Sequence, residues 1–234
     1  MNDTDPNARS RIFIWDLPVR VMHWSFLLLV VGAWATRELP GEWFVWHVRI
    51  GYAIFILTAT RIVWGVLGTR YARFAEFVRG PQSVLQYLRG AAQRHYAGHN
   101  PAGGWMVLLL LLLLLAQAVT GLFANDQISE TGPLFGYITV DRSDFLTSLH
   151  KIGFKILQAA VALHIVAVLF HLFVRRENLV RPMLDGAKSV DLVPQGAVGI
   201  NGSQAMRALA VAAIWGVALW WVVRSAPEAS LFAF

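Results

Sequence analysis

Five apolar runs dominate this 234-residue sequence, and each is long enough to cross a lipid bilayer. A helix needs roughly 20 apolar residues to span the ~30 Å hydrocarbon core. Turn-forming or polar residues bound each run. The pattern predicts an all-α integral membrane protein with these five transmembrane helices: Val19–Thr36, Trp46–Leu67, Trp105–Phe123, Asp144–Val174 and Met206–Val223.

Composition excludes several other classes of protein. Only 15% of the residues are charged, against ~25% in an average soluble domain. The formal net charge is +6, but the basic residues lie in the loops between the apolar runs, as topology signals do. We therefore expect no nucleic-acid partner. Cysteine is absent, which excludes disulfides, thiolate zinc sites, iron–sulfur clusters and covalently attached c-type haem.

The distribution of Lys and Arg predicts the orientation in the membrane. One side of the predicted bundle carries twelve of them, and the opposite side carries only Arg37, Arg142 and Arg224 outside the spans. The positive-inside rule then places the N-terminus in the cytoplasm and the C-terminus on the outside. The N-terminal residues lack the apolar core of a cleaved signal peptide. The twelve are Arg9, Arg11, Arg20, Arg70, Arg73, Arg79, Arg89, Arg94, Arg175, Arg176, Arg181 and Lys188.

Histidines are the main functional candidates. Ionisable residues inside a span are costly and are functional candidates by default. Two of the seven histidines, His95 and His99, fall in a loop and are expected to be solvated. The other five lie in predicted spans: His23, His47, His150, His164 and His171.

Topology sorts four of these histidines into two levels. His47 and His150 each lie near the start of a span that enters the membrane from the outer face, and they form the predicted outer pair. His23 opens the first span at the cytoplasmic face. His164 follows His150 by 14 residues, about 21 Å along the helix axis and on nearly the same side. His23 and His164 therefore form the predicted inner pair. Imidazole is an axial ligand of haem iron, so each pair is expected to supply both axial ligands of one haem b.

Residues near the two pairs suit a haem. Gly51 and Gly153 lie about one turn from ligands and leave room for a porphyrin edge, although helix packing explains each glycine equally well. Arg61 is expected either to contact an inner haem propionate or to snorkel towards the interface. Arg49 and Lys151 are candidates for the outer propionates. The roles of Lys155 and His171 stay open; His171 is either a propionate or quinone contact or a satisfied interfacial residue.

Four motifs resemble the bacterial cytochrome b561 family, and most closely the branch that includes the cytochrome b subunit of nickel–iron hydrogenases. The resemblance covers roughly residues 10–185. It implies a four-helix core that binds two haems b through His23, His47, His150 and His164. It further implies electron transfer between a quinone pool and a partner protein. The motifs are WDLPVRVMHW (Trp15–Trp24), WHVRIGY (Trp46–Tyr52), RIVWG (Arg61–Gly65) and LHKIG with ALHIVAVLFH (Leu149–His171).

A fifth span departs from the four-helix core that the resemblance implies. We predict a dihaem transmembrane domain over residues 1–188, a linker over 189–205 and a C-terminal helix with its tail over 206–234. The linker assignment follows from its Gly, Pro and Gln content.

The sequence is compatible with three functions. The first is a dihaem b-type cytochrome that transfers electrons between quinone and a redox partner, either a c-type cytochrome or a hydrogenase or dehydrogenase subunit. The second is a stand-alone quinone-linked oxidoreductase, for example one acting on superoxide, with the basic residues near the outer pair attracting the anion. The third is a Zn²⁺ or Cu²⁺ site in a transporter or enzyme. Two histidines per level fall short of the three ligands typical of catalytic zinc.

Overall fold

The computed structural model describes residues 11–39, 43–91 and 95–228. Within them, all five predicted spans form helices long and apolar enough to cross a membrane. The observed helices begin and end within a few residues of the predicted bounds, at α1 (Leu17–Glu38), α2 (Trp43–Leu67), α5 (Pro101–Leu122), α6 (Val140–Phe173) and α8 (Ala205–Arg224). The N-terminal residues, Arg9 and Arg94, which entered the orientation argument, lie outside the described ranges.

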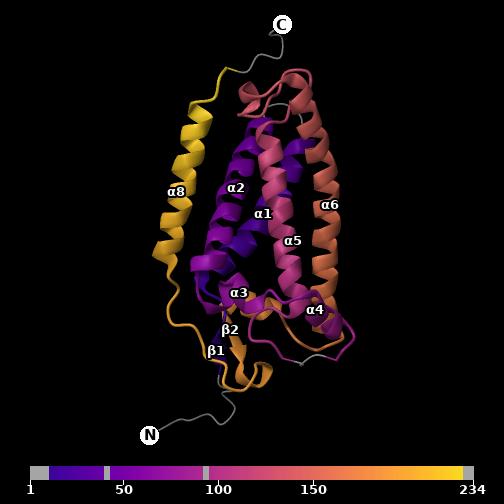
Figure 1. The fold of residues 1–234 in the computed structure, drawn as a ribbon, viewed down its shortest axis with the longest axis vertical. Helices are drawn as coiled ribbons and strands as arrows, with labels where there is room; N and C mark the ends of the chain where they lie inside the picture. Colours follow the sequence, from indigo (N-terminus) through magenta and orange to yellow (C-terminus); the bar gives the residue numbers. More distant parts are fainter. Residues whose placement is uncertain (1–10, 40–42, 92–94, 229–234) are drawn as a thin grey trace.

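The spans alternate in direction (Figure 1). α1, α5 and α8 run away from the end that carries the short elements, and α2 and α6 run back towards it. α2 packs against α1, α5 and α8, while α6 packs most closely against α5. α6 has 34 residues and is therefore about 50 Å long, so it extends beyond the ~30 Å hydrocarbon core.

Short elements form a cap at the end of the bundle where α1 begins (Figure 1). Two three-residue strands pair antiparallel there, with Ile12 opposite Lys188. This small sheet and the short helices were not predicted. The ten described Lys and Arg residues of the basic side lie in or beside this cap. Its elements are β1 (Arg11–Phe13), β2 (Ala187–Ser189), α3 (Phe74–Phe77), α4 (Pro81–Leu88) and α7 (Val180–Asp185), with the 3₁₀ turns Arg70–Ala72 and Val190–Leu192.

The segment that was predicted as a linker packs into this cap. Val193 is buried in one core cluster with Ile14, Trp15 and Trp64. The backbone N–H of Ile200 donates to the carbonyl of Phe13 at 2.9 Å. Residues 189–205 therefore hold the start of α8 against the bundle, and the division into three units stays a prediction.

Asp16 anchors α1 to α2 inside the cap. Its side chain is the N-cap of α1 and accepts from the Val19 backbone N–H at 2.7 Å. The other carboxylate oxygen accepts from Trp64 Nε1 at 2.9 Å and from Thr69 Oγ1 at 2.5 Å. Asp16 and Trp64 are almost fully buried. These bonds give a structural reason for the Trp-Asp-Leu-Pro and Arg-Ile-Val-Trp-Gly motifs, because they satisfy a charge that burial would otherwise make costly.

At the opposite end a polar network fixes the connection between α5 and α6. The Asn125 side chain donates to Ser143 Oγ at 2.6 Å and to Asp144 at 2.8 Å. The Asn125 backbone N–H donates to Thr147 Oγ1 at 3.0 Å. This network sets the position of the first turns of α6, and therefore of His150, one turn beyond Thr147.

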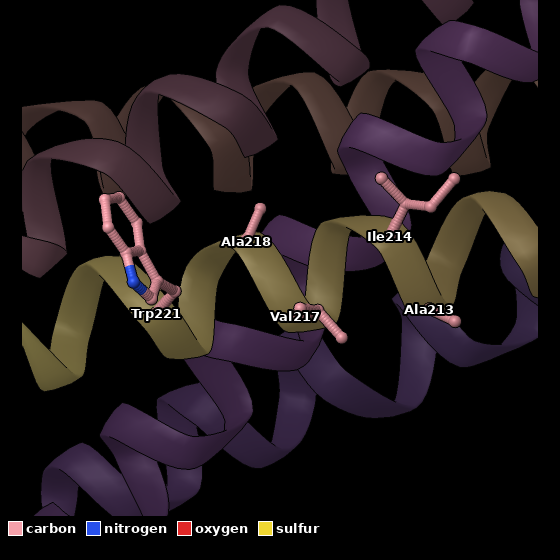
Figure 2. A pocket seen from close by; sticks show the side chains of 5 residues that line it. All are labelled: Ala213, Ile214, Val217, Ala218 and Trp221. Carbon is pink, nitrogen blue, oxygen red and sulfur yellow. The ribbon is translucent and has the colours of Figure 1, made fainter.

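α8 lies along the side of the bundle (Figure 1). It contacts α2 through an edge-on ring contact between Trp215 and Phe55. A shallow hollow on α8 is lined only by apolar residues (Figure 2), namely Ala213, Ile214, Val217, Ala218 and Trp221. It offers no polar group for a cofactor or substrate. In a membrane such a surface faces lipid tails or another apolar helix.

Candidate functional site

The candidate site lies where α1 and α2 face α6. His23 on α1 lies beside His164 on α6, with ring centroids 6.3 Å apart and planes at 63°. His47 on α2 lies beside His150 on α6, with centroids 6.2 Å apart and planes at 79°. The structure thus brings together the same inner and outer pairs that the topology predicts.

An apolar layer separates the two pairs. Leu157 lies seven residues from both His150 and His164, so it occupies the same side of α6 between them. Its side chain is almost fully buried and belongs to a cluster with Ile54, which lies seven residues after His47. The bundle therefore holds two distinct sites stacked along its axis.

Hydrogen bonds orient both imidazoles of the outer pair. His47 Nδ1 is 2.8 Å from the carbonyl oxygen of Ala33, and His150 Nδ1 is 3.0 Å from that of Gln117. A carbonyl only accepts, so Nδ1 carries the proton in each ring and Nε2 keeps its lone pair. A second-sphere hydrogen bond of this kind fixes the tautomer and ring orientation of a metal ligand.

Glycines leave space around these rings. A Cβ added to Gly121 would lie 2.9 Å from Cε1 of His150, so α5 approaches this ring closely because it has glycine there. A Cβ on Gly51 would meet no heavy atom within 4 Å, and one on Gly153 would lie 2.9 Å from the Gln117 side-chain oxygen. Gly51, one turn from His47, thus borders open space of the kind that a porphyrin edge requires.

Unpaired polar atoms gather at the inner level. Arg61 is 5% exposed. Its guanidinium lies over the ring of Phe74 at 5.5 Å. Arg61 Nη1 and His23 Nδ1 are buried without a hydrogen-bond partner among the described residues. A buried polar group without a partner is costly, so these atoms indicate a ligand that the protein itself does not supply.

The prediction that His99 is a solvated loop residue is wrong. Its ring lies between Trp15 and Phe77, with centroid distances of 4.7 and 4.5 Å, and its Nδ1 is buried. Burial and the charge of Arg61 lower the pKa of His99 to about 3, so the ring is neutral. The prediction is wrong because of tertiary structure, since the chain before α5 folds back over the end of the bundle and brings His99 against Trp15 and Phe77. His95, in the same loop, is exposed as predicted.

The other basic candidates lie on the surface. Arg49 is exposed and stacks over the Trp46 ring at 4.9 Å, and Lys151 and Lys155 are exposed on α6. None of these three side chains is among the buried residues of the bundle. Contact of Arg49 and Lys151 with the outer propionates stays a prediction.

His171 has protein partners instead of a free face. Its Nε2 is 3.0 Å from the Tyr87 hydroxyl, and its Nδ1 is 3.4 Å from Glu177 Oε2. Glu177 in turn accepts from Lys188 Nζ at 2.7 Å. The Nδ1 contact is an ion-pair distance without hydrogen-bond geometry. Because both ring nitrogens face protein groups, these contacts favour the interfacial histidine over a ligand-binding one.

No group of three or more His, Asp or Glu side chains that could hold a metal ion occurs within the described part of the chain. Among the described residues, each level offers two imidazoles as metal ligands. This donor set suits a metal that already has four ligands in a plane, as haem iron does.

Comparison with known proteins identifies the family of this chain. The sequence model of the family described as prokaryotic cytochrome b561 matches residues 14–186. The chain belongs to the prokaryotic cytochrome b561 family. It is a multi-pass membrane cytochrome of the b type that acts in electron transfer. The match ends just before β2, so α8 lies beyond the part that the family model describes.

Three curated relatives of this b561 cytochrome carry related names. It is 24% identical over 215 residues to the "Probable Ni/Fe-hydrogenase B-type cytochrome subunit" of Bradyrhizobium diazoefficiens, covering 77% of this chain and 87% of the relative. It is 25% identical to the protein of that name from Rhodobacter capsulatus, covering 77% and 82%. It is 23% identical to the "Probable Ni/Fe-hydrogenase 1 B-type cytochrome subunit" of Escherichia coli K12, covering 76% and 90%.

Proposed function

We propose that this b561 cytochrome binds two haems b, one at each histidine pair, and carries electrons between a quinone pool and a redox partner protein. The single observation that supports this most is the spacing of the two pairs, 6.3 and 6.2 Å between ring centroids. A metal–nitrogen bond is about 2 Å long and an imidazole centre lies about 1 Å from its nitrogen, so two imidazoles on one metal have centroids about 6 Å apart.

Haem iron supplies reversible one-electron oxidation and reduction when it is bound, and bis-histidine ligation leaves no open position for oxygen chemistry. The chain's own contribution is to hold two imidazoles on opposite sides of each site. In the outer pair the carbonyls of Ala33 and Gln117 keep both Nε2 lone pairs available. This arrangement supports electron transfer and not oxygen activation.

Two stacked sites divide the distance across the membrane. The histidines of α6 are 14 residues apart, or about 21 Å along the axis, within a hydrocarbon core of ~30 Å. The layer that contains Leu157 and Ile54 keeps the sites apart. A relay of two centres therefore shortens each electron-transfer step relative to a single centre.

Arg61 is the proposed partner of an inner haem propionate. Its guanidinium is buried with one nitrogen unpaired, and a guanidinium matches a carboxylate geometrically. Gly51 is proposed to border the outer porphyrin, and Gly153 to permit close helix approach. Arg49 and Lys151 are proposed to contact the outer propionates, and because both are exposed, their side chains would have to fold inward to do so.

The named relatives favour a hydrogenase as the redox partner, over a c-type cytochrome. We propose that the cap and the N-terminus face the cytoplasm of the bacterial inner membrane and that the C-terminus faces the periplasm. The supporting observation is that the described basic residues of the predicted cytoplasmic side all lie in or beside the cap.

Quinol-driven reduction of the purified cytochrome tests this function. Mixing with a reduced short-chain quinone should reduce both haems, and adding superoxide instead should not. Reduction by superoxide that outpaces reduction by quinol would favour the stand-alone oxidoreductase. Failure of quinol to reduce either haem would contradict the proposed role.

A further inference from the structure

His99 carries a hydrogen-bonding group at the cap end of the bundle. Its Nδ1 is buried and unpaired among the described residues. Its ring is held between Trp15 and Phe77. Asn100, the next residue, is the N-cap of α5 and accepts from the Gly103 backbone N–H at 2.7 Å. The backbone of His99 is therefore fixed by the first turn of α5, and its ring is in contact with two aromatic side chains.

Arg61 is the second unpaired donor at this level. It comes from α2, and its guanidinium lies over the ring of Phe74 at 5.5 Å. The Phe74 ring contacts that of Phe77, which in turn contacts His99, with centroid distances of 5.8 and 4.5 Å. Asp16 is a buried carboxylate that interacts electrostatically with Arg61, but no hydrogen bond joins it to Arg61 or His99 among the described residues. Asp16 already accepts hydrogen bonds from Val19, Trp64 and Thr69. One guanidinium nitrogen and one imidazole nitrogen, both buried and both without a hydrogen-bond partner among the described residues, suit an anion.

We infer that His99 and Arg61 together bind one carboxylate of the inner haem, forming an anion clamp of these two residues. The inference rests on the proposed function, since it presupposes a haem at His23 and His164. A carboxylate suits the pair because it accepts a charge-assisted bond from the guanidinium and a second bond from the neutral ring. His99 thereby becomes a haem-binding residue that is not an axial ligand.

This clamp explains why a histidine occupies an aromatic pocket. If position 99 served only to pack against Trp15 and Phe77, a phenylalanine would do so without burying an unpaired nitrogen. The clamp also links the cap to the cofactor, because the loop before α5 supplies one of its two members. Loss of the His99 donor should weaken the hold on the inner haem and leave the outer haem unchanged.

The test compares three variants of the full-length protein in detergent. His99→Phe preserves the aromatic packing and removes the donor. His99→Gln restores an N–H donor of similar reach. His95→Phe is the matched control in the same loop. For each, haem per chain is measured after prolonged washing, and the midpoint potentials of both haems are measured by redox titration.

We expect His99→Phe to lower the midpoint potential of the inner haem, because removing a donor to the propionate leaves more negative charge near the iron and favours the oxidised state. The inner haem should also be lost faster on washing. His99→Gln should recover most of both properties, and His95→Phe should match wild type. Arg61→Gln should shift the potential in the same direction, and adding His99→Phe to it should have less than the additive effect.

Three results would overturn the clamp. Unchanged potential and retention in His99→Phe would show that His99 serves packing only. Conversion of the inner haem to a high-spin form would show that His99 is an axial ligand. If both His99 variants fail to fold, an unshifted inner potential in Arg61→Gln overturns the clamp. A wild-type protein without haem would instead contradict the proposed function, so the two failures are distinguishable.

Discussion

The imidazole of His47 faces that of His150 across the bundle, with ring centroids 6.2 Å apart, although the two residues come from different helices and are separated by 103 positions in the sequence. The Nδ1 of His47 is hydrogen-bonded to the carbonyl of Ala33, and the Nδ1 of His150 to that of Gln117. The proposal that this pair shares one metal gives clear predictions for mutagenesis.

Replacing one member of a pair should remove one haem and spare the other. His164→Leu should reduce the haem content by about half and retain the outer haem, because a haem with one remaining axial imidazole is held weakly. His150→Leu is the reciprocal variant and should retain the inner haem. Redox titration distinguishes the two signals. If both variants lose the same signal, the pairing is wrong.

Gly121→Ala should disturb the outer haem. The added methyl group would lie 2.9 Å from Cε1 of His150, so the ring or α5 must move. Overpacking of this kind costs about 1–3 kcal/mol, and the displaced ring should shift the outer midpoint potential. The control is Gly216→Ala on α8, where the methyl group would make an ordinary contact at 3.9 Å with Ile56. Equal effects of the two variants would contradict this account.

Asp16→Ala should destabilise the junction of α1, α2 and the cap. The substitution removes the N-cap of α1 and leaves the Trp64 indole N–H buried without an acceptor. Loss of a cap costs about 1 kcal/mol and an unpaired buried donor about 1–3 kcal/mol, so thermal stability should fall clearly. Asp191→Ala, at an exposed position in the cap, should leave the melting temperature unchanged. A stable Asp16→Ala protein would show that the network is dispensable.

Glu177 should make the cap sensitive to acid. Burial alone raises the pKa of this carboxyl group, but hydrogen bonds from His171 and Lys188 lower it to about 2, below its ordinary value of 4.5. A depressed pKa stabilises the fold above the ordinary value, and that stabilisation is lost as the pH falls from about 4.5 towards 2. The melting temperature of Glu177→Gln should therefore lie below wild type at neutral pH and converge with it in acid.

The matched control is Glu76→Gln, because Glu76 pairs with Arg70 and Arg73 on the surface. Surface ion pairs contribute little to stability, so its melting curve should follow wild type at every pH. A constant gap between Glu177→Gln and wild type over the acid range would mean that the ion pair is not the cause.

Sequence reasoning predicted the parts of the molecule that depend on periodicity and length. Apolar length alone fixes the five spans to within a few residues. The 14-residue interval between His150 and His164 predicts two levels on α6, and the alternation of spans then selects His47 and His23 as their neighbours. These relations are local or follow from the bilayer, so no tertiary information is required.

Other features depend on contacts that no local pattern encodes. β1 pairs with β2 across 174 positions, through strands too short for an alternating signal. His99 lies in a polar loop whose path is set by packing against Trp15 and Phe77, so its burial was missed. The one available signal was its position directly before the Asn-Pro-Ala-Gly-Gly start of α5, which ties the loop end to a helix.

The most direct test of two haems per chain is the haem b content of the purified, full-length protein, combined with its reduced-minus-oxidised spectrum. The two histidine pairs predict about two haems b per polypeptide, both low-spin and six-coordinate in both redox states. One haem per chain, a high-spin centre, or a colourless protein that binds stoichiometric zinc would contradict the assignment of one bis-histidine haem to each pair.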